Sequence, residues 1–495
     1  MNAAALPAPA PGGDDPRPEV DSFDVFDTLI ARRCIEPHRV FEAIAPATGL
    51  ADFAARRQAA EAAVAHGPYT LADIYARLAA DLALPAGAAE RLMALEVEAE
   101  LAAVIPIAEN LARVKDGDLL ISDMYLGEAV IRRLLVQAGL TREVGLFVSA
   151  HGKRSGEVWP LVKAQFALGR HLGDNEHSDV AMPTRFGITA EKTDRFAPSA
   201  VEAWFLNLGL RDMAELLREA RLSSWRADPV RRQLQLTQIQ LNLPILILSS
   251  IELARVAKAA GASHLLFASR DGRQWAGLHR AVAAQAGGEP PPVEYFYTSR
   301  RARTAGSPDY LDYARERLGE RGLVVDTCGS GWSMAMLFQA LGLEGRDLFF
   351  VHRIATPEIY RRRADPPAGA RIHALVGPEA PGVNNMVLEL ANTAEHGSVR
   401  DVRRLAGKPL PLFEADPRPE PVRRRVAEQA EDFAAAAALV TPGRLRESLS
   451  LSSPDIAAVV HKLYQVLCLD QTLIATFAAA HLDEDRAAMA AMGMV

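Results

Sequence analysis

Two aspartates lie close together in "SFDVFDTLIARR", the segment from Ser22 to Arg33. A short apolar run leads into Asp24, and Asp27 follows three positions later. A strand that ends in acidic and hydroxyl residues is typical of a site that needs a nucleophile or a metal ligand. Asp24 is therefore a candidate for both roles. Asp27 is either a proton-transfer group or the cap of the turn that follows the strand.

Three later segments carry further side chains of this kind after short apolar runs. Ser122 follows "LLI", Lys153 stands in "HGKRSGEVW", and Asp174 and Asp179 both belong to "GDNEHSD". Together with the first aspartate, these residues supply a carboxylate nucleophile, a hydroxyl, a cation and an acidic pair. That combination suits phosphoryl transfer.

The elements that must position these residues alternate between strand and helix. Apolar strand-like runs occur near 20–24, 116–122 and 143–150, with helical patterns between them. This alternation predicts an α/β fold with a parallel, doubly wound sheet. The helical block at 37–110 interrupts the alternation once, as an inserted cap would. Because ligands bind at the carboxyl ends of the strands in such sheets, we expect the reactive side chains to converge there.

Each of these residues then has a chemical role in phosphoryl transfer. Asp24 can attack phosphorus and form an aspartyl-phosphate. Asp24, Asp174 and Asp179 can hold Mg²⁺, which prefers oxygen ligands. Ser122 can donate a hydrogen bond to a phosphoryl oxygen, and Lys153 can neutralise the charge that develops.

The same segments, in the same order, resemble the four motifs of the haloacid-dehalogenase (HAD) superfamily of hydrolases. In its first motif an aspartate stands four residues before a threonine, as Asp24 stands before Thr28, the latter a further ligand-contact candidate. "LLIS", "KRSGEVW" and "GDNEHSD" are similar to the second, third and fourth motifs. The resemblance covers about 20–200 and implies a Rossmann-like fold with a helical C1 cap and a Mg²⁺-dependent phosphatase. Within the superfamily, "SFDVFDTL" and "SDMYL" look like predicted hydrolases that are associated with bacterial surface-polysaccharide gene clusters.

The sequence departs from this family at Phe26, where its phosphatases usually carry an aspartate as the general acid and base. The resemblance implies that the Phe26 backbone carbonyl still ligates Mg²⁺, but a phenylalanine cannot transfer a proton. Losing a positioned acid or base typically costs about 10²–10⁴-fold in rate. One interpretation is a phosphatase in which Asp27, Asp123 or a cap residue transfers the proton, or whose leaving group needs none. Asp123 is also a candidate ligand contact.

Two other interpretations of Phe26 stay open. Enzymes of the superfamily that act on haloacids or phosphonates also lack this aspartate. The haloacid enzymes do not need Mg²⁺, and the phosphonate enzymes use a lysine in the cap. The stretch 37–110 contains no lysine. Alternatively, the domain binds a phosphorylated ligand and has little catalytic activity, as a binding or scaffold module. In the cap, Arg56, Arg57 and Glu61 either select the substrate or form a solvated helix face.

A second alternating region follows a helical stretch and predicts another α/β domain. Strands running into loops are expected in "HLLFASRDG", "VEYFYTSR", "GLVVDTCGSGWS" and "DLFFVHRI". A Gly-Ser-Gly loop between a strand and a helix offers backbone N–H groups for phosphate binding. The order of these loops is loosely similar to that of phosphoribosyltransferases, so a bifunctional enzyme is an alternative. The predicted ligand contacts are Arg270, Asp271, Ser299, Arg300, Asp326, Gly329, Ser330 and Gly331.

These patterns divide the 495 residues into a series of expected regions. The resemblance implies that the whole is a two-domain hydrolase. The expected regions are a flexible leader (1–19), a HAD-like domain (20–200) with its cap at about 36–112, a helical connector (201–258), a second α/β domain (259–400) and a mainly helical C-terminal region (401–495).

The composition limits the partners of the protein. The formal net charge of −7 argues against general binding to nucleic acid or to membrane surfaces. Three distant cysteines form no disulfide framework or CxxC zinc pattern, which suits a reducing cytoplasm. We therefore expect a cytoplasmic protein whose partner is a small phosphorylated substrate, a sugar phosphate or a nucleotide-like compound. The sequence does not indicate an oligomeric state.

Overall fold

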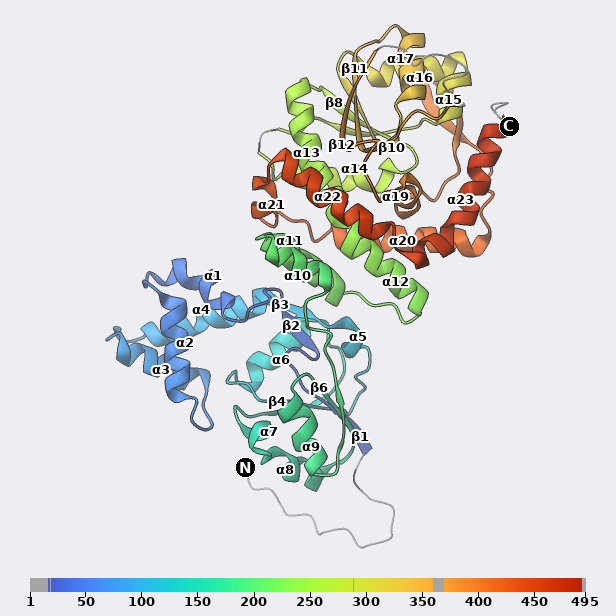
Figure 1. Ribbon diagram of the computed structural model, residues 1–495. Coiled ribbons are helices and arrows are strands. Elements are labelled where there is room, and N and C mark those ends of the chain that lie inside the picture. Colours follow the sequence, from blue (N-terminus) through green and yellow to red (C-terminus); the bar gives the residue numbers. More distant parts are fainter. Residues whose placement is uncertain (1–16, 18, 288, 359–368, 492–495) are drawn as a thin grey trace. The chain divides into compact units, whose positions relative to one another are not determined.

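The computed structural model describes residues 17, 19–287, 289–358 and 369–491 (Figure 1). The predicted leader, 1–19, lies outside the described residues except at 17 and 19. The chain forms two compact units, Met1–Ala200 with Leu222–Trp225 and Val201–Arg221 with Arg226–Val495. Each contains a five-stranded sheet in which all strands are parallel, so the predicted two-domain α/β architecture is confirmed.

The sheet of unit 1 has the strand order β5-β4-β1-β6-β7, with β1 at its centre. The chain first adds strands on one side of β1 and then returns to its other side. Such a reversal opens a crevice at the carboxyl ends of the central strands, where ligands bind in doubly wound sheets. The strands are β1 (Glu19–Phe23), β4 (Leu119–Ser122), β5 (Gly145–Val148), β6 (Ala167–Gly173) and β7 (Thr189–Lys192).

Apolar side chains of β4 alternate between the two faces of this sheet. Leu120 packs with α6, whereas Leu119 and Ile121 pack with Trp159 and Val162 of α8. Both faces are therefore covered by helices, as a parallel sheet requires. Trp159 is fully buried, as expected for a core residue. The helices around this sheet are α5 (Ala108–Leu111), α6 (Glu128–Gln137), α7 (Gly152–Ser155), α8 (Val158–Gln165), the π-helix η1 (Glu176–Ala181) and α9 (Met182–Arg185).

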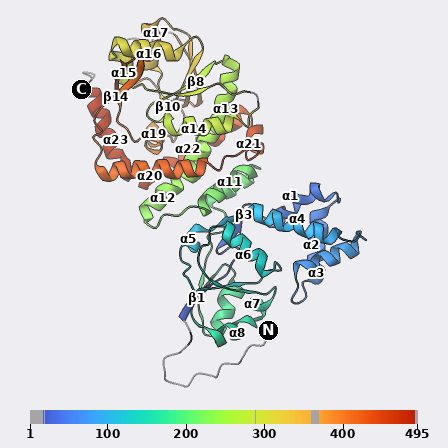
Figure 2. The same ribbon diagram turned by 180° about the vertical axis from the view of Figure 1, so that it is seen from behind.

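Four helices are inserted between β1 and β4, where a cap is expected. They are α1 (Arg39–Thr48), α2 (Phe53–Val64), α3 (Leu71–Asp81) and α4 (Ala88–Ala103). They stand together in both views, coloured blue (Figures 1 and 2). An antiparallel ribbon of β2 (Ile30–Arg32) and β3 (Val104–Pro106) joins them to the sheet. The sequence analysis did not predict this ribbon.

Arg57 anchors the cap helices to one another. Its buried guanidinium donates to both carboxylate oxygens of Glu96 on α4, each at 2.7 Å, and to Glu61 at 2.8 Å. It also lies over the rings of Phe41 and Tyr125, 4.6 and 5.0 Å from their centroids. The expectation of a solvated helix face is therefore wrong for Arg57, because its charge is neutralised inside the protein.

Unit 2 repeats the doubly wound plan with the strand order β12-β11-β10-β8-β9. Here the strand order reverses between β8 and β10. The strands are β8 (His264–Ala268), β9 (Val293–Phe296), β10 (Gly322–Gly329), β11 (Arg346–Arg353) and β12 (Ala370–Val376).

Helices cover both faces of this second sheet as well. Leu266, Val324 and Phe350 share one core cluster with residues of α16 (Pro308–Leu318) and α17 (Trp332–Leu341). On the other face, Phe267 and Phe349 contact Trp275 of α14 (Gly272–Ala283). The remaining helices of this unit are α10 (Ala200–Asn207), α11 (Arg211–Leu222), α12 (Pro229–Thr237), η2 (Gln238–Asn242), α13 (Leu243–Ala260), α15 (Arg300–Ala305), α19 (Asn385–Asn392), α20 (Glu420–Ala437), α21 (Arg446–Ser450), α22 (Ser453–Leu467) and α23 (Gln471–Ala491).

One detail of the predicted regions differs from the structure. The predicted connector, 201–258, clusters with unit 2 except at Leu222–Trp225, and α13 packs against α14. Before the C-terminal helices, β13 (Val399–Leu405) and β14 (Lys408–Phe413) form an antiparallel hairpin that the sequence analysis did not predict. Among the described residues, no single helix is long and apolar enough to cross a membrane. The pair α22 and α23 meets that test only jointly, with a bend of 81° between them.

Candidate active site

Asp24 lies directly after β1, at the carboxyl end of the central strand of unit 1. Its backbone N–H donates to the carbonyl of Leu172 on β6 at 2.8 Å, which holds the residue between the two strands. Its carboxylate is buried, and the hydroxyl of Thr28 donates to Oδ2 at 3.0 Å. The turn after the strand therefore supplies both the acid and a hydrogen-bond donor that orients it.

Lys153 links two carboxylates of this site. Its ammonium donates to Asp24 Oδ1 and to Asp179 Oδ1, the latter at 2.6 Å. The short helix α7 carries this lysine, and Asp123 accepts hydrogen bonds from the backbone N–H groups of Lys153 and Arg154 at 2.8 and 2.9 Å. Asp123 thus holds the start of α7, and both of its oxygens are engaged there. This role makes Asp123 a positioning residue in the structure.

The acidic pair comes from the loop after β6. Asp179 lies in the π-helix η1, and its Oδ2 accepts a hydrogen bond from the backbone N–H of Asn175 at 3.0 Å. A Cβ atom on Gly173 would come within 2.3 Å of the Asp179 Cβ, so the glycine allows the carboxylate to approach the strand end. Asp24, Asp174 and Asp179 each offer a carboxylate oxygen, and these atoms all lie within 4.8 Å of one another.

The cluster holds more negative charge than Lys153 can balance. Burial raises the pKa of Asp24 to about 8, and the charges of Asp179 and Asp174 act in the same direction against the attraction of Lys153. Burial and the charge of Asp179 also raise the pKa of Asp174, to about 6. Burial acts to raise the pKa of Asp179 too, but the hydrogen bond from His171 and the charge of Lys153 hold it below its usual range. Oxygen donors with surplus negative charge fit a divalent cation such as Mg²⁺.

The other predicted residues of unit 1 lie at or after the carboxyl ends of β4 and β1. Ser122 is the last residue of β4, and its hydroxyl has no hydrogen-bond partner among the described residues. Asp27 adopts a left-handed backbone conformation (φ 57°), and its charge acts on Asp174 and Arg32. The ring of Phe26 lies under the Arg32 guanidinium, 4.9 Å from its Cζ atom. The Phe26 side chain is thus a packing group beside the site.

His171 is a residue of this site that sequence reasoning missed. Its Nδ1 lies 2.9 Å from the hydroxyl of Ser22, its Nε2 lies 3.3 Å from Asp179 Oδ1, and its ring packs edge-on against Trp159. Burial lowers the pKa of His171, so the neutral ring is favoured. The only sequence signal was its place one residue before an apolar position in the predicted strand, which does not mark a functional residue.

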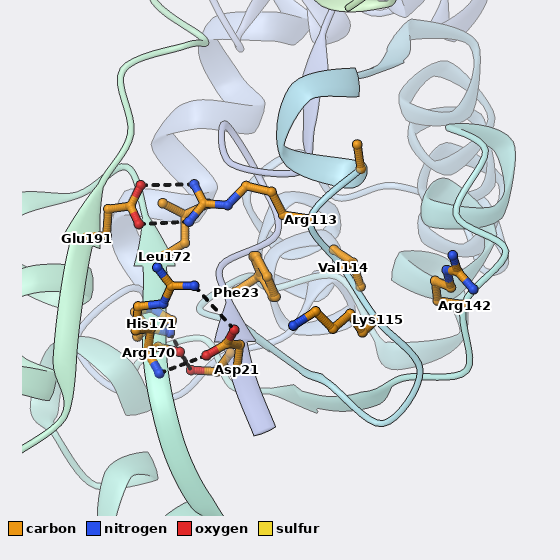
Figure 3. Close-up of a pocket in the computed structure, with 12 residues that line it drawn as sticks. Asp21, Phe23, Arg113, Val114, Lys115, Arg142, Arg170, His171, Leu172 and Glu191 are labelled. Atoms are coloured by element: carbon orange, nitrogen blue, oxygen red, sulfur yellow. Dashed lines mark hydrogen bonds and ion pairs between the residues drawn. The ribbon is translucent and has the colours of Figure 1, made fainter. Parts of the chain in front are cut away.

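A cavity of about 330 Å³ in unit 1 does not coincide with this site (Figure 3). It is lined by Asp21, Ser22 and Phe23, which precede Asp24, and by basic side chains such as Arg113 and Arg170. Arg113 pairs with Glu191 at 2.7 Å and Arg170 with Asp21 at 3.8 Å. Arg113 and Arg170 thus already have carboxylate partners, whereas Lys115, a further lining residue, forms no ion pair among the described residues.

Unit 2 contains a larger cavity, of about 660 Å³, at the carboxyl ends of its central strands. All eight residues predicted as ligand contacts in the second region line it: Arg270, Asp271, Ser299, Arg300, Asp326, Gly329, Ser330 and Gly331. Sequence reasoning missed further lining residues, among them Arg303 on α15, Glu389 on α19, and His481 and Glu484 on α23. Helical residues far along the chain carry no loop signature, so nothing in the sequence marked them.

A comparison of the chain with known protein families finds no match, and a comparison with curated proteins finds no significantly similar sequence.

Proposed function

We propose that unit 1 is a Mg²⁺-dependent phosphohydrolase of the HAD type that acts through an aspartyl-phosphate on a small phosphorylated metabolite, such as a sugar phosphate or a nucleotide-like compound. The convergence of the carboxylates of Asp24, Asp174 and Asp179 carries this proposal, together with the pairing of Asp24 and Asp179 with the Lys153 ammonium. The order of the sequence motifs supports it independently. The surface-polysaccharide grouping remains a further expectation.

In the first half of the proposed reaction, a carboxylate oxygen of Asp24 attacks phosphorus. The bond from phosphorus to the leaving oxygen breaks, and the departing alcohol takes up a proton. Lys153 stabilises the charge that develops, and Ser122, whose hydroxyl has no partner among the described residues, donates to a phosphoryl oxygen. In the second half, water hydrolyses the aspartyl-phosphate, which releases phosphate and restores Asp24.

Mg²⁺ would be held by Asp24, Asp174, Asp179 and the Phe26 carbonyl, and it would supply positive charge for the phosphoryl oxygens. Phe26 itself provides no proton. We prefer Asp27 to Asp123 as the candidate donor, because both Asp123 oxygens accept backbone N–H groups that hold the start of α7. The charge of Asp27 acts on Asp174 and on Arg32, so its carboxylate lies near the acidic pair.

A phosphate-release assay on a broad panel of phosphorylated metabolites, with and without Mg²⁺, tests this function. We expect turnover of at least one phosphomonoester by the full-length protein with Mg²⁺ and its loss in Asp24→Asn. No turnover of any phosphomonoester would reject the phosphohydrolase and leave a binding or scaffold module.

We also propose that unit 2 binds a phosphorylated ligand. The support is the position of its cavity, which lies beside the loop Gly329–Gly331 and the amino end of α17. Backbone N–H groups at such a helix start favour an anion. A transferase activity of this unit remains the alternative that its loop order suggests.

A further inference from the structure

The cavity of unit 2 lies where the strand order of its sheet reverses. Asp271 follows β8 and Asp326 belongs to β10, the two strands between which the reversal occurs. Ligand sites in doubly wound sheets are found at this position. The volume of about 660 Å³ also falls within the range of about 300–1,000 Å³ that is typical of small-molecule sites.

Arg303 is a partly buried cation in the lining of this cavity. Arg303 donates from Nε to the Thr298 hydroxyl and from Nη1 to the Ser333 hydroxyl, both at 3.1 Å. Among the described residues it forms no ion pair with a carboxylate, and burial lowers its pKa. Ser333 lies in the first turn of α17, whose amino end adds positive partial charge. The charge of Asp326 acts on this guanidinium, but its hydrogen-bond partners are neutral. A desolvated guanidinium with neutral hydrogen-bond partners favours an anion, most strongly a phosphate that accepts two hydrogen bonds.

Two partly buried carboxylates, Asp271 and Asp326, also line the cavity. Thr327 donates through its hydroxyl to Asp271 at 3.2 Å and through its backbone N–H to Asp326 at 2.9 Å. Burial raises the pKa of Asp326 to about 7, against the attraction of the Arg303 charge, and it raises the pKa of Asp271 well above its usual range. The charge of Glu389 acts on both in the same direction as burial. Within the described part of the chain, neither aspartate forms an ion pair.

Asp271 and Asp326 do not belong to a group of three or more converging metal-ligand side chains among the described residues. Among the described residues, the carboxylates that converge closely enough to hold a metal ion are those around Asp24, not these. Buried carboxylates that lack a metal or an ion-pair partner gain most from charge-assisted hydrogen bonds. Hydroxyl groups of a ligand supply such bonds.

The C-terminal helix α23 lines the cavity and is tied to it by ion pairs. His481 contacts Glu389 at 3.2 Å, and Glu484 contacts Arg270 at 2.6 Å. Arg270 and Glu389 therefore already have ion-pair partners, whereas among the described residues Arg303, Asp271 and Asp326 have only neutral hydrogen-bond partners. One cation and two acids in the lining are thus available to a ligand.

We propose that unit 2 carries a second ligand site for a phosphorylated sugar or related phosphorylated polyol, with the phosphoryl group at Arg303 and hydroxyl groups at Asp271 and Asp326. This inference deepens the proposed phosphate-binding role of unit 2. It does not depend on hydrolysis in unit 1.

Calorimetric titration of the full-length Asp24→Asn protein in EDTA tests the proposal, because turnover and Mg²⁺ binding in unit 1 are then suppressed. The probes are inorganic phosphate, glucose 1-phosphate, ribose 5-phosphate, UDP-glucose, free glucose and phosphoethanolamine. We expect at least one sugar phosphate to bind more tightly than inorganic phosphate, and free glucose to bind most weakly. Absence of saturable binding by every sugar phosphate would overturn the proposal. Tighter binding of phosphoethanolamine than of any sugar phosphate would overturn the hydroxyl assignment.

Variants in the same background assign the phosphoryl and hydroxyl contacts. Arg303→Gln should weaken every phosphorylated probe about tenfold or more, and Arg303→Lys, which keeps the charge, should weaken them less. Asp326→Asn should weaken the sugar phosphates about tenfold but not inorganic phosphate. The matched control is Arg315→Gln on α16, an exposed arginine paired with Asp312. Folded Arg303 variants, verified by circular dichroism, that bind like this control would contradict the assignment of the anion site.

Discussion

Phe26 stands at the position that decides how unit 1 would handle protons. Its ring lies under the guanidinium of Arg32, which in turn forms two 2.8 Å hydrogen bonds to Glu100 of cap helix α4. The residue thus connects the loop of Asp24 to the strand that leads into the cap. The Phe26 side chain is therefore part of the packing around the site. In the proposed phosphohydrolase reaction, the proton must come from another group.

Asp27 is the group that we expect to supply this proton. Asp27→Asn should lower kcat by about 10²-fold or more for alkyl phosphates, whose leaving group needs a proton. It should change kcat far less for p-nitrophenyl phosphate, whose leaving group departs as a stable anion. Steady-state kinetics on the two substrates measure the difference. An equal loss on both would show that Asp27 positions the loop and does not transfer a proton.

Arg57 shows how a charged residue can serve stability inside the cap. Its guanidinium is buried against Glu96 and Glu61, and Tyr75 donates to Glu96 at 2.7 Å. Arg57→Met should destabilise the cap by about 3–5 kcal/mol, because it leaves the Glu96 carboxylate buried without its cation. Hydrogen exchange of the α2 and α4 amides measures this change. The neighbouring, exposed Arg56 is the matched control, and equal exchange in Arg56→Met and Arg57→Met would contradict the assigned role.

At the scale of elements, the junction between β6 and the π-helix η1 brings Asp174 and Asp179 to the site. Gly173→Ala would place a Cβ 2.3 Å from the Asp179 Cβ, so the turn must shift. We expect a loss of about 1–3 kcal/mol in stability and weaker Mg²⁺ binding, measured by thermal unfolding and by titration with Mg²⁺. Gly127→Ala is the control, since nothing lies within 4 Å of its Cβ and its φ is negative. Unchanged Mg²⁺ affinity in Gly173→Ala would refute this account of the junction.

Elements with strong local signals could be predicted from the sequence, and elements that depend on distant partners could not. The runs "LLIS" and "HLLFA" are apolar because both faces of their strands are covered, and both proved to be strands. The ribbon of β2 and β3 pairs segments about 70 residues apart across the whole cap, so no local pattern reveals it. Arg303, His481 and Glu484 were missed for a related reason. Each lies on a helix, and the spacing of apolar residues along a helix indicates which face is buried but not which polar side chains line a cavity.

At the scale of the whole molecule, unit 1 should respond to pH and to Mg²⁺ through its carboxylate cluster. The pKa of Asp24 is about 8 in the folded protein and near 3.8 in an unfolded chain, so the folded state binds more protons between these values. Its stability must therefore fall as pH rises through this window. Calorimetric melting of the metal-free full chain should show one transition that moves to lower temperature from pH 5 to 8.

Two comparisons isolate the cause of that pH dependence. Mg²⁺ should raise the same transition, since a cation that binds only the folded state stabilises it. Asp24→Asn should flatten the pH dependence, because the amide does not titrate. A transition in the metal-free protein that rises with pH, or that Asp24→Asn leaves as steep, would show that the cluster does not control stability.

Trapping the covalent intermediate tests the central claim most directly. The full-length protein is mixed with Mg²⁺ and a phosphomonoester that it turns over, quenched in acid during the reaction and reduced with borohydride, which converts an aspartyl-phosphate into homoserine. Peptide mass spectrometry then locates the modified residue. The account predicts homoserine at position 24 in samples that contain substrate, and none without substrate or in Asp24→Asn. Turnover with an unmodified Asp24, or with the modification at another residue, would contradict it.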